Sequence, residues 1–252
     1  MRDFGRELCD RVAFIRGLLA ESGSKGLVFA NSGGKDSALV GILCKKACDD
    51  TLGVILPCAS ARNLGEDRAD AEALAGMYGI ASRAVDLTAV KQAILDALGD
   101  RPPGHNADIN IAPRLRMIAL YAISADEGRL VAGTGNRSEI YMGYFTKWGD
   151  GACDFNPIAD LTATEVYAFL RYLGAPKSIL TKAPSAGLFE GQTDEADMGI
   201  SYRAIDAFLT DGEANPADRA RLDRFHTAGA HKRRMPRWYG YSAGESAILT
   251  KE

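Results

Sequence analysis

The chain alternates short, wholly apolar runs with longer segments whose apolar residues recur every three or four positions. The first long segment, residues 3–21, places its apolar side chains on one stripe, which predicts an amphipathic helix. The run Gly26-Leu-Val-Phe-Ala30 is apolar throughout, as expected of a strand buried on both faces. Helical spacing returns over residues 35–48. The chain therefore opens as helix, strand, helix.

The same alternation continues to residue 133. We predict strands at 26–31, 52–57, near 81–86 and at 129–133, with helices at 65–78, 88–98 and 111–127 between them. Apolar strands separated by helices are typical of a parallel sheet covered on both faces. The fold class is therefore α/β, and we expect a single doubly wound domain over residues 1–252, with a parallel sheet of about five strands flanked by helices.

The pattern changes after Gly133, because no further strand is evident. We expect glycine-rich loops over 143–156, a polar loop over 182–195, and helices over 162–173, 197–210 and 216–227. The second half of the chain is thus predicted to add a helical C-terminal portion to the sheet domain.

Composition and charge limit the kinds of partner that this chain is expected to bind. With 252 residues, 46% hydrophobic and 25% charged, the chain has the make-up of an ordinary globular protein. The net charge of -3 gives no electrostatic reason to expect a nucleic-acid partner. The first ten residues lack a signal-peptide pattern, and no apolar run approaches the roughly 20 residues of a membrane helix. We expect a cytoplasmic protein without a nucleic-acid or membrane partner.

The segment from Ala30 to Ser37 reads Ala-Asn-Ser-Gly-Gly-Lys-Asp-Ser and joins a predicted strand to a predicted helix. Backbone N–H groups and the helix dipole make such a turn a phosphate site. The common G-x-x-x-x-G-K-[ST] pattern is absent. Because this turn carries an acid, Asp36, it indicates a metal ion beside the phosphate. The alternative is a tight turn capped by Ser32.

A second turn, Gly133-Thr-Gly-Asn-Arg-Ser-Glu139, also begins where a strand is predicted to end. Ligands of open parallel sheets bind beyond the carboxyl ends of the strands, so both turns should face one crevice. Two carboxylates, Asp36 and Glu139, beside a polyphosphate would suit Mg²⁺. Either acid alone would be interpreted as a helix-start residue that favours the dipole.

Two later loops contain ligand-binding residue types. Residues 143–154 combine glycines and aromatics with one lysine and two acids, which suits a planar, partly charged ligand. Residues 182–195 form a long polar loop of the kind that closes over a site. An ordinary surface loop is the alternative for the second segment.

Taken together, these blocks resemble the ammonia-using NAD⁺ synthetases, a branch of the ATP pyrophosphatases marked by S-G-G-x-D-S. The resemblance runs from about residue 4 to about residue 237. The S-G-G-x-D-S motif alone would also fit other amide-forming enzymes and tRNA-thiolating enzymes. The discriminating stretches are Arg114–Met117, Gly133-Thr134 with Glu139, Gly143–Gly151, Pro184–Leu188 with Gly191–Glu195, Gly199–Tyr202 and His231–Arg234.

The resemblance implies a ligase with two steps. The carboxylate of deamido-NAD⁺ (nicotinic acid adenine dinucleotide) attacks the α-phosphate of ATP, which releases pyrophosphate and leaves an NAD-adenylate. Ammonia then displaces AMP and gives NAD⁺. Asp36 and Glu139 would hold Mg²⁺, and Asp150 would receive ammonia, which makes these three the implied catalytic residues. Positioning and charge neutralisation supply most of the rate in such reactions.

The resemblance also assigns the substrate contacts. The implied ATP contacts are Ala30, Asn31, Ser32, Gly33, Gly34, Lys35, Asp36, Ser37, Thr134 and Ser185. The implied deamido-NAD⁺ contacts are Arg114, Lys147, Asp154, His231 and Lys232. One departure stands out, because Ala163 occupies a position where family members often place a phosphate-contacting lysine. Lys35 or Lys182 would then have to supply that contact.

Family members of this kind are homodimers that bind deamido-NAD⁺ at the subunit interface, and residues 3–21 and 111–127 are plausible dimer elements. The phosphate turn follows too soon after residue 1 for a preceding glutaminase domain, so free ammonia is the expected nitrogen donor unless a separate glutaminase chain supplies it. Two alternatives stay open. A tRNA-thiolating relative would call for a C-x-x-C pair, which is not evident. A non-enzymatic adenine-nucleotide-binding module would need the turn but neither Asp36 nor Glu139.

Overall fold

The computed structural model describes residues 2–99, 101, 103–182, 184–185, 191–236 and 239. The predicted apolar runs form four strands, Gly26–Ala30 (β1), Thr51–Ile55 (β2), Ala81–Ala84 (β3) and Arg129–Ala132 (β4). They pair in parallel in the order β3-β2-β1-β4. The α/β class and the parallel sheet are therefore confirmed.

The expected number of about five strands is wrong for the described residues, which form four. Residues beside β4 start a fifth pairing but make only an isolated parallel bridge between Ala132 and Phe155. Just before it, the Asp154 side chain accepts the Val131 N–H at 2.7 Å, in addition to backbone bonds. Pro157 follows and has no N–H to donate. The ladder stops there.

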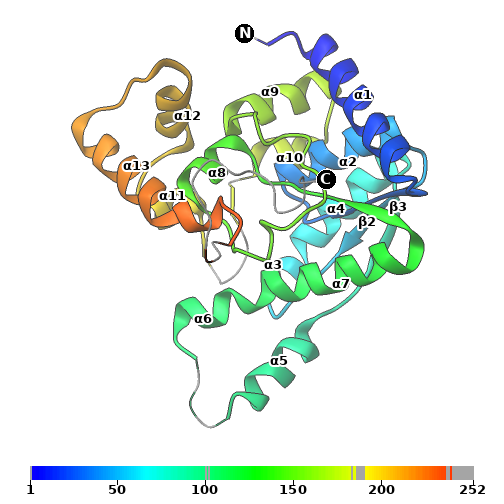
Figure 1. Ribbon diagram of the computed structural model, residues 1–252, viewed down its shortest axis with the longest axis horizontal. Coiled ribbons are helices and arrows are strands. Elements are labelled where there is room, and N and C mark those ends of the chain that lie inside the picture. The colour runs from blue at the N-terminus through cyan, green and yellow to red at the C-terminus, as the bar shows by residue number, and fades with distance from the viewer. Residues whose placement is uncertain are drawn as a thin grey trace.

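Helices cover both faces of the sheet (Figure 1). One face packs against Phe4–Ser22 (α1), Lys35–Ala47 (α2), Glu66–Tyr78 (α4), Ala163–Leu173 (α9) and Lys177–Thr181 (α10). The other face packs against Ile111–Glu127 (α7), and Thr88–Ala97 (α5) lies against α7 and reaches this core through Ile94. Side chains of β1 alternate between the two cores, with Phe29 in the first and Val28 in the second.

The C-terminal portion is helical, as predicted, and has a small core of its own. It consists of Arg137–Met142 (α8), Asp194–Met198 (α11), Tyr202–Asp211 (α12), Pro216–Ala228 (α13) and the 3₁₀ turn Gly229–Lys232 (η1). The expected helix over 197–210 is wrong, because it is two helices. Gly199 ends α11 at φ +65°, and the Ser201 hydroxyl caps the first turn of α12.

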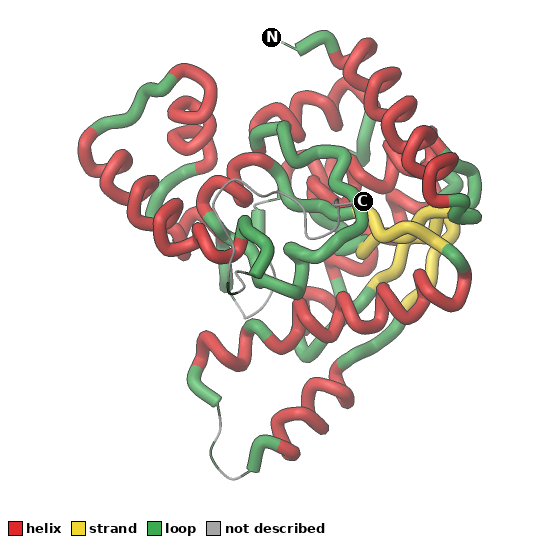
Figure 2. Tube along the Cα trace, in the orientation of Figure 1, coloured by secondary structure: helices red, strands yellow, loops and turns green. Residues whose placement is uncertain are grey.

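Two short helices complete the described part of the chain, Ala61–Leu64 (α3) and His105–Ile109 (α6). Figure 2 shows α5 and α6 extending away from the sheet as an arm. No side chain of α5 is buried within this chain. Among the described residues, every helix is too short or too polar to cross a membrane.

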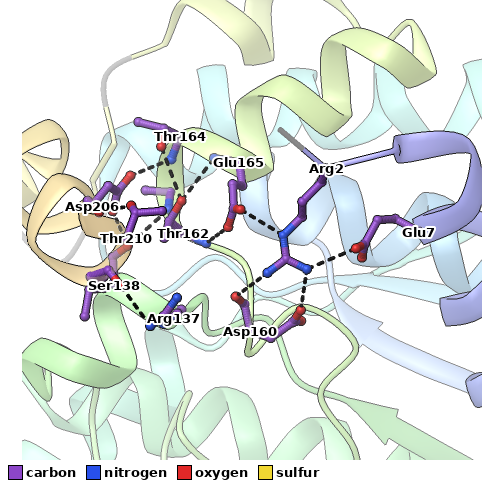
Figure 3. A network of polar contacts seen from close by, with 12 residues as sticks. Arg2, Glu7, Arg137, Ser138, Asp160, Thr162, Thr164, Glu165, Asp206 and Thr210 are labelled. Atoms are coloured by element: carbon purple, nitrogen blue, oxygen red, sulfur yellow. Dashed lines mark hydrogen bonds and ion pairs between the residues drawn. The ribbon is translucent and has the colours of Figure 1, made fainter. Parts of the chain in front are cut away.

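A polar network ties the N-terminus and the C-terminal helices to the segment around α9 (Figure 3). Arg2 binds Asp160 at 2.9 Å and Glu165 at 2.8 Å, so it anchors the start of α1. On the other side, the buried Asp206 of α12 accepts hydrogen bonds from the Ser138 hydroxyl and from the Thr164 N–H. Asp206 thus links α8, α9 and α12.

Candidate active site

A cavity of about 540 Å³ opens at the carboxyl ends of β1, β2 and β4. This is the place where open parallel sheets bind ligands, and the volume suits a small molecule. Its walls come from the turn after β1, the segment after β2, the turn after β4, the loop before Asp150, and the C-terminal helices. Both predicted turns therefore face one crevice.

The turn after β1 requires glycine at one position. Gly33 has φ +72°, and a Cβ there would lie 2.2 Å from the Asp67 carbonyl oxygen. The Ser32 hydroxyl lies 3.0 Å from that of Ser37 and accepts the Gly34 N–H at 3.3 Å. Gly34, the N-cap of α2, provides no side-chain cap. The first N–H groups of α2 are therefore free of a capping side chain, which favours an anion there.

Asp36 and Glu139 meet, although 103 positions separate them. Asp36 lies in the first turn of α2, and Glu139 is the third residue of α8. The Lys35 Nζ lies 2.6 Å from Asp36 Oδ2 and 3.6 Å from Glu139 Oε1. One ammonium group thus marks a point that both carboxylates face. The predicted juxtaposition of the two acids is present in the structure.

Asn136 orients both acids. It is the N-cap of α8, and with Glu139 it forms a capping box in which the Asn136 N–H donates to Glu139 Oε2 at 3.2 Å. Its side-chain N–H₂ donates to Asp36 Oδ1 at 3.0 Å. Sequence reasoning missed this residue, and the N-x-x-E spacing was the signal that could have revealed it.

Lys35 is buried among polar and aromatic groups. Its Nζ lies 5.1 Å from the ring centroid of Tyr202 and 5.9 Å from that of Tyr167. Burial opposes the charge, but Asp36 and Glu139 outweigh it and raise the pKa of Lys35 above its ordinary value. The lysine is therefore charged at neutral pH.

The pKa of Glu139 is also raised, which for a carboxylic acid favours the neutral form. Burial, followed by the nearby charge of Asp36, raises the pKa of Glu139 to about 8. The Tyr202 hydroxyl donates to Asp194 Oδ2 at 2.9 Å and lies 3.4 Å from Glu139 Oε1. Asp194 and Tyr202 were not among the predicted site residues, although both lie in the discriminating stretches of the sequence.

A second group of charges lines the cavity after β2. Lys182 contacts Asp67 at 2.6 Å and Asp70 at 2.7 Å, so its ammonium is already paired with two carboxylates. Arg116 donates to the Leu56 carbonyl at 3.0 Å and to the Asn63 side chain at 2.8 Å. Arg116 was not predicted to contribute to the site.

The residue at the position where family members often place a phosphate-contacting lysine has a structural role here. Ala163 is buried at the start of α9, and its N–H donates to the Ser138 hydroxyl at 3.1 Å. Lys35 and Lys182 both line the cavity. A phosphate contact by either lysine stays a prediction.

Asp150 lies on another wall of the same cavity. It accepts the Thr146 N–H at 2.9 Å, and the Thr146 hydroxyl in turn donates to the Asn110 side chain at 2.7 Å. Asp150 is exposed by its accessible surface, yet the groups packed around its carboxyl desolvate it and raise its pKa above its ordinary value. A raised pKa makes a carboxylate a better proton acceptor. Its predicted role in receiving ammonia is consistent with this position and stays a prediction.

The predicted ATP and deamido-NAD⁺ contacts are placed differently. Nine of the ten predicted ATP contacts line the cavity, all except Gly33. Among the five predicted deamido-NAD⁺ contacts, which all lie in the described part of the chain, Lys232 alone lines it. Its Nζ donates to the Gly143 and Phe145 carbonyls, each at 2.8 Å.

Three of the others form a chain of contacts at the exposed rim. Arg114 donates to the Lys147 carbonyl at 3.3 Å, and the Lys147 Nζ donates to the His231 carbonyl at 2.7 Å. Asp154 lies elsewhere, held by the Tyr121 hydroxyl at 3.1 Å and by the β4 backbone. Tyr121 is seven residues beyond Arg114 on α7, about 10 Å along the helix.

The acids fit a magnesium ion by their chemistry. The described residues contain no group of three or more His, Cys, Asp or Glu side chains arranged to hold a metal. Mg²⁺, however, usually takes one or two protein carboxylates together with water and substrate phosphates. Asp36 and Glu139 both face the Lys35 ammonium and line the cavity. They supply the kind of donor set that Mg²⁺ requires.

Comparison with known proteins agrees with this geometry. The family model for NAD synthase matches residues 7–236. The chain belongs to the NAD synthase family. The predicted family resemblance is therefore confirmed over most of the chain.

Three proteins illustrate what this chain is similar to. The NH₃-dependent NAD⁺ synthetase of Carboxydothermus hydrogenoformans is 45% identical over 229 residues, which cover 89% of this chain and 93% of that protein. A solved NMN synthetase from Francisella tularensis has a TM-score of 0.91 and 34% identity, covering 96% of this chain and 100% of the other. An NH₃-dependent NAD synthetase structure from Campylobacter jejuni has a TM-score of 0.78 and 29% identity, covering 94% and 99%.

Proposed function

We propose that this chain is a ligase that amidates deamido-NAD⁺ with ammonia at the expense of ATP, giving NAD⁺, AMP and pyrophosphate. One observation carries the proposal. Asp36 from the first turn of α2 and Glu139 from α8 both face the Lys35 ammonium in a cavity that the S-G-G-x-D-S turn also lines. Membership of the NAD synthase family gives this arrangement its substrates.

The chain's own residues account for the first step. The uncapped N-terminus of α2, with Ser32 and Ser37, would bind the departing pyrophosphate. Asp36 and Glu139 would hold Mg²⁺, which neutralises charge on the phosphates. An oxygen of the deamido-NAD⁺ carboxylate bonds to the α-phosphorus as the bond to pyrophosphate breaks.

In the second step, the nitrogen of ammonia bonds to the acyl carbon and AMP leaves with the electrons of the broken C–O bond. Asp150 faces the same cavity and would take the proton that the attacking nitrogen loses. Free ammonia is the proposed donor. The predicted cytoplasmic location stays a prediction.

A second candidate substrate is the mononucleotide, deamido-NMN, whose amidation gives NMN. The observation in its favour is the TM-score of 0.91 with the Francisella tularensis NMN synthetase, compared with 0.78 for the Campylobacter jejuni NAD synthetase. Both substrates end in the same nicotinate carboxylate. The same cavity chemistry would therefore serve either one.

One assay tests both candidates. The protein is incubated with ATP, Mg²⁺ and ammonium plus either deamido-NAD⁺ or deamido-NMN, and the products are separated by chromatography. We expect NAD⁺ and AMP in equal amounts from the dinucleotide, with a higher kcat/KM than for the mononucleotide. The reverse ratio would make the mononucleotide the substrate. An absence of AMP with both, at several pH values, would exclude the ligase.

We further propose a homodimer with the deamido-NAD⁺ site at the interface. Arg114 and His231 are exposed, and Ile118 on the same helix as Arg114 is 66% exposed, which is high for an isoleucine. A second copy packed on α7 would cover these residues. Analytical ultracentrifugation should give a dimer mass, and Ile118→Asp should shift it toward the monomer.

A further inference from the structure

Lys35 lies where the metal of the proposed reaction would bind. Its side chain is 5% exposed, and its Nζ lies 2.6 Å from Asp36 and 3.6 Å from Glu139. The rings of Tyr167 and Tyr202 also lie near Nζ, with centroids 5.9 Å and 5.1 Å away. A buried ammonium group thus bridges the two carboxylates that are proposed to hold Mg²⁺.

The two cations compete for the same oxygen atoms. Mg²⁺ contacts its ligands at about 2.0–2.1 Å, which is shorter than the distances from Asp36 and Glu139 to the ammonium. Two positive charges at contact distance in a buried site repel each other strongly. The ammonium therefore has to leave before a metal ion can contact both carboxylates.

The lysine can leave without moving the backbone. Its flexible stem starts at the first residue of α2, and the side chain lines the cavity. The ATP phosphates would lie in that cavity at the same helix N-terminus. Their negative charge would receive the displaced ammonium.

We propose that Lys35 is a resident counter-ion, which holds Asp36 and Glu139 together in the metal-free protein and is displaced toward the nucleotide phosphates when the metal binds. The inference rests on the metal site of the proposed function. It assigns to Lys35 a positioning role. Its consequence is that the metal binds weakly alone and tightly with ATP, so that Lys35 couples the binding of the two.

Mn²⁺ alone is the probe, with free Mn²⁺ measured by electron paramagnetic resonance on the full-length protein without nucleotide. Lys35→Met keeps the length of the side chain and removes its charge, so it should bind Mn²⁺ about tenfold more tightly than the unmodified protein. Lys35→Arg, the matched control, keeps the cation and should stay within about twofold of the unmodified protein. A non-hydrolysable ATP analogue should increase the Mn²⁺ affinity of the unmodified protein more than that of Lys35→Met.

Thermal unfolding gives a second, independent measurement. Lys35→Met leaves two carboxylates facing each other, so its Tm should fall in metal-free buffer and recover more with Mn²⁺ than that of the unmodified protein. Lys35→Gln, whose amide can still donate to one acid, serves the same comparison if the methionine variant is poorly folded. Equal Mn²⁺ affinity in the unmodified, Met and Gln proteins would overturn the role of Lys35. Failure of all of them to bind Mn²⁺, even with the ATP analogue, would instead overturn the proposed metal site itself.

Discussion

The two halves of the site are built in different ways. On the half proposed to bind ATP, Asn136 donates hydrogen bonds to both Asp36 and Glu139, and all three side chains lie largely out of solvent. On the half proposed to bind deamido-NAD⁺, Arg114 and Lys147 donate to main-chain carbonyls at an exposed rim, and the Lys147 Nζ also lies 5.3 Å from the ring centroid of Trp148. The first half is complete within one chain, whereas the second presents donors outward.

This difference has a physical reason. Buried charges are stable only when they are paired and hydrogen-bonded, so the fold must organise them before substrate arrives. Exposed charges cost little and need no partner. A change on the proposed ATP half should therefore alter the free energy of unfolding as well as turnover, and a change on the rim should alter binding of one substrate.

The largest expected effect comes from Asp36→Asn. The amide keeps the size of the side chain and removes the charge that faces the phosphates, so kcat should fall about 1,000-fold. The fold should persist, as seen by an unchanged circular dichroism spectrum. Asp49→Asn, on the exposed turn before β2, is the control and should retain full activity. A fully active Asp36→Asn would remove Asp36 from the metal role.

Gly33→Ala should damage the ATP half through its backbone. The position has φ +72°, and the new Cβ would lie 2.2 Å from the Asp67 carbonyl oxygen. We expect a loss of about 1–3 kcal/mol in the free energy of unfolding and a higher KM for ATP. Gly76→Ala is the matched control, because that helical glycine has open space around it, and the protein should gain about 0.5–1 kcal/mol. Urea titrations of both variants test the pair.

Lys147→Met tests the rim. Its ammonium donates to the His231 carbonyl and lies over the ring of Trp148, two contacts at the rim whose removal should leave the fold intact. If it contacts deamido-NAD⁺, the KM for that substrate should rise about tenfold, the size of one charged hydrogen bond. The KM for ATP and kcat should change less than about twofold. An equal rise in both KM values would show that the two halves are not separate.

The smallest expected effect is a pH dependence of stability on the ATP half. Because the folded state raises the pKa of Glu139 from 4.5 to about 8, its contribution to stability is complete below pH 4.5 and is lost as the pH rises through 8. Glu139→Gln, which resembles the protonated acid, should therefore gain Tm relative to the unmodified protein between pH 5 and pH 9. A difference of a few degrees is expected in metal-free buffer. A gap that stays constant across this range would contradict the raised pKa.

Much of the fold was predictable because buried parallel strands and amphipathic helices leave distinct periodic patterns. The strands near residues 26, 52, 81 and 129 and most of the long helices follow from those patterns. The strand count failed because Phe155 makes one bridge and the pairing then stops, which depends on how Asp154 meets the edge of β4. The prediction of a single helix over 197–210 failed because Gly199 ends one helix and Ser201 caps the start of the next within an otherwise helical pattern.

The site was predictable to the same extent. The sequence by itself predicted a phosphate turn and determined that one acid lies in this turn and a second follows another strand, since each is a local pattern. Only the tertiary structure decided that the Lys35 ammonium lies between Asp36 and Glu139 and that Asn136 donates to both acids. Those contacts join residues about 100 positions apart, so their distances depend on how α2 and α8 pack. Local periodicity specifies which elements form, whereas the packing of those elements fixes which charges meet.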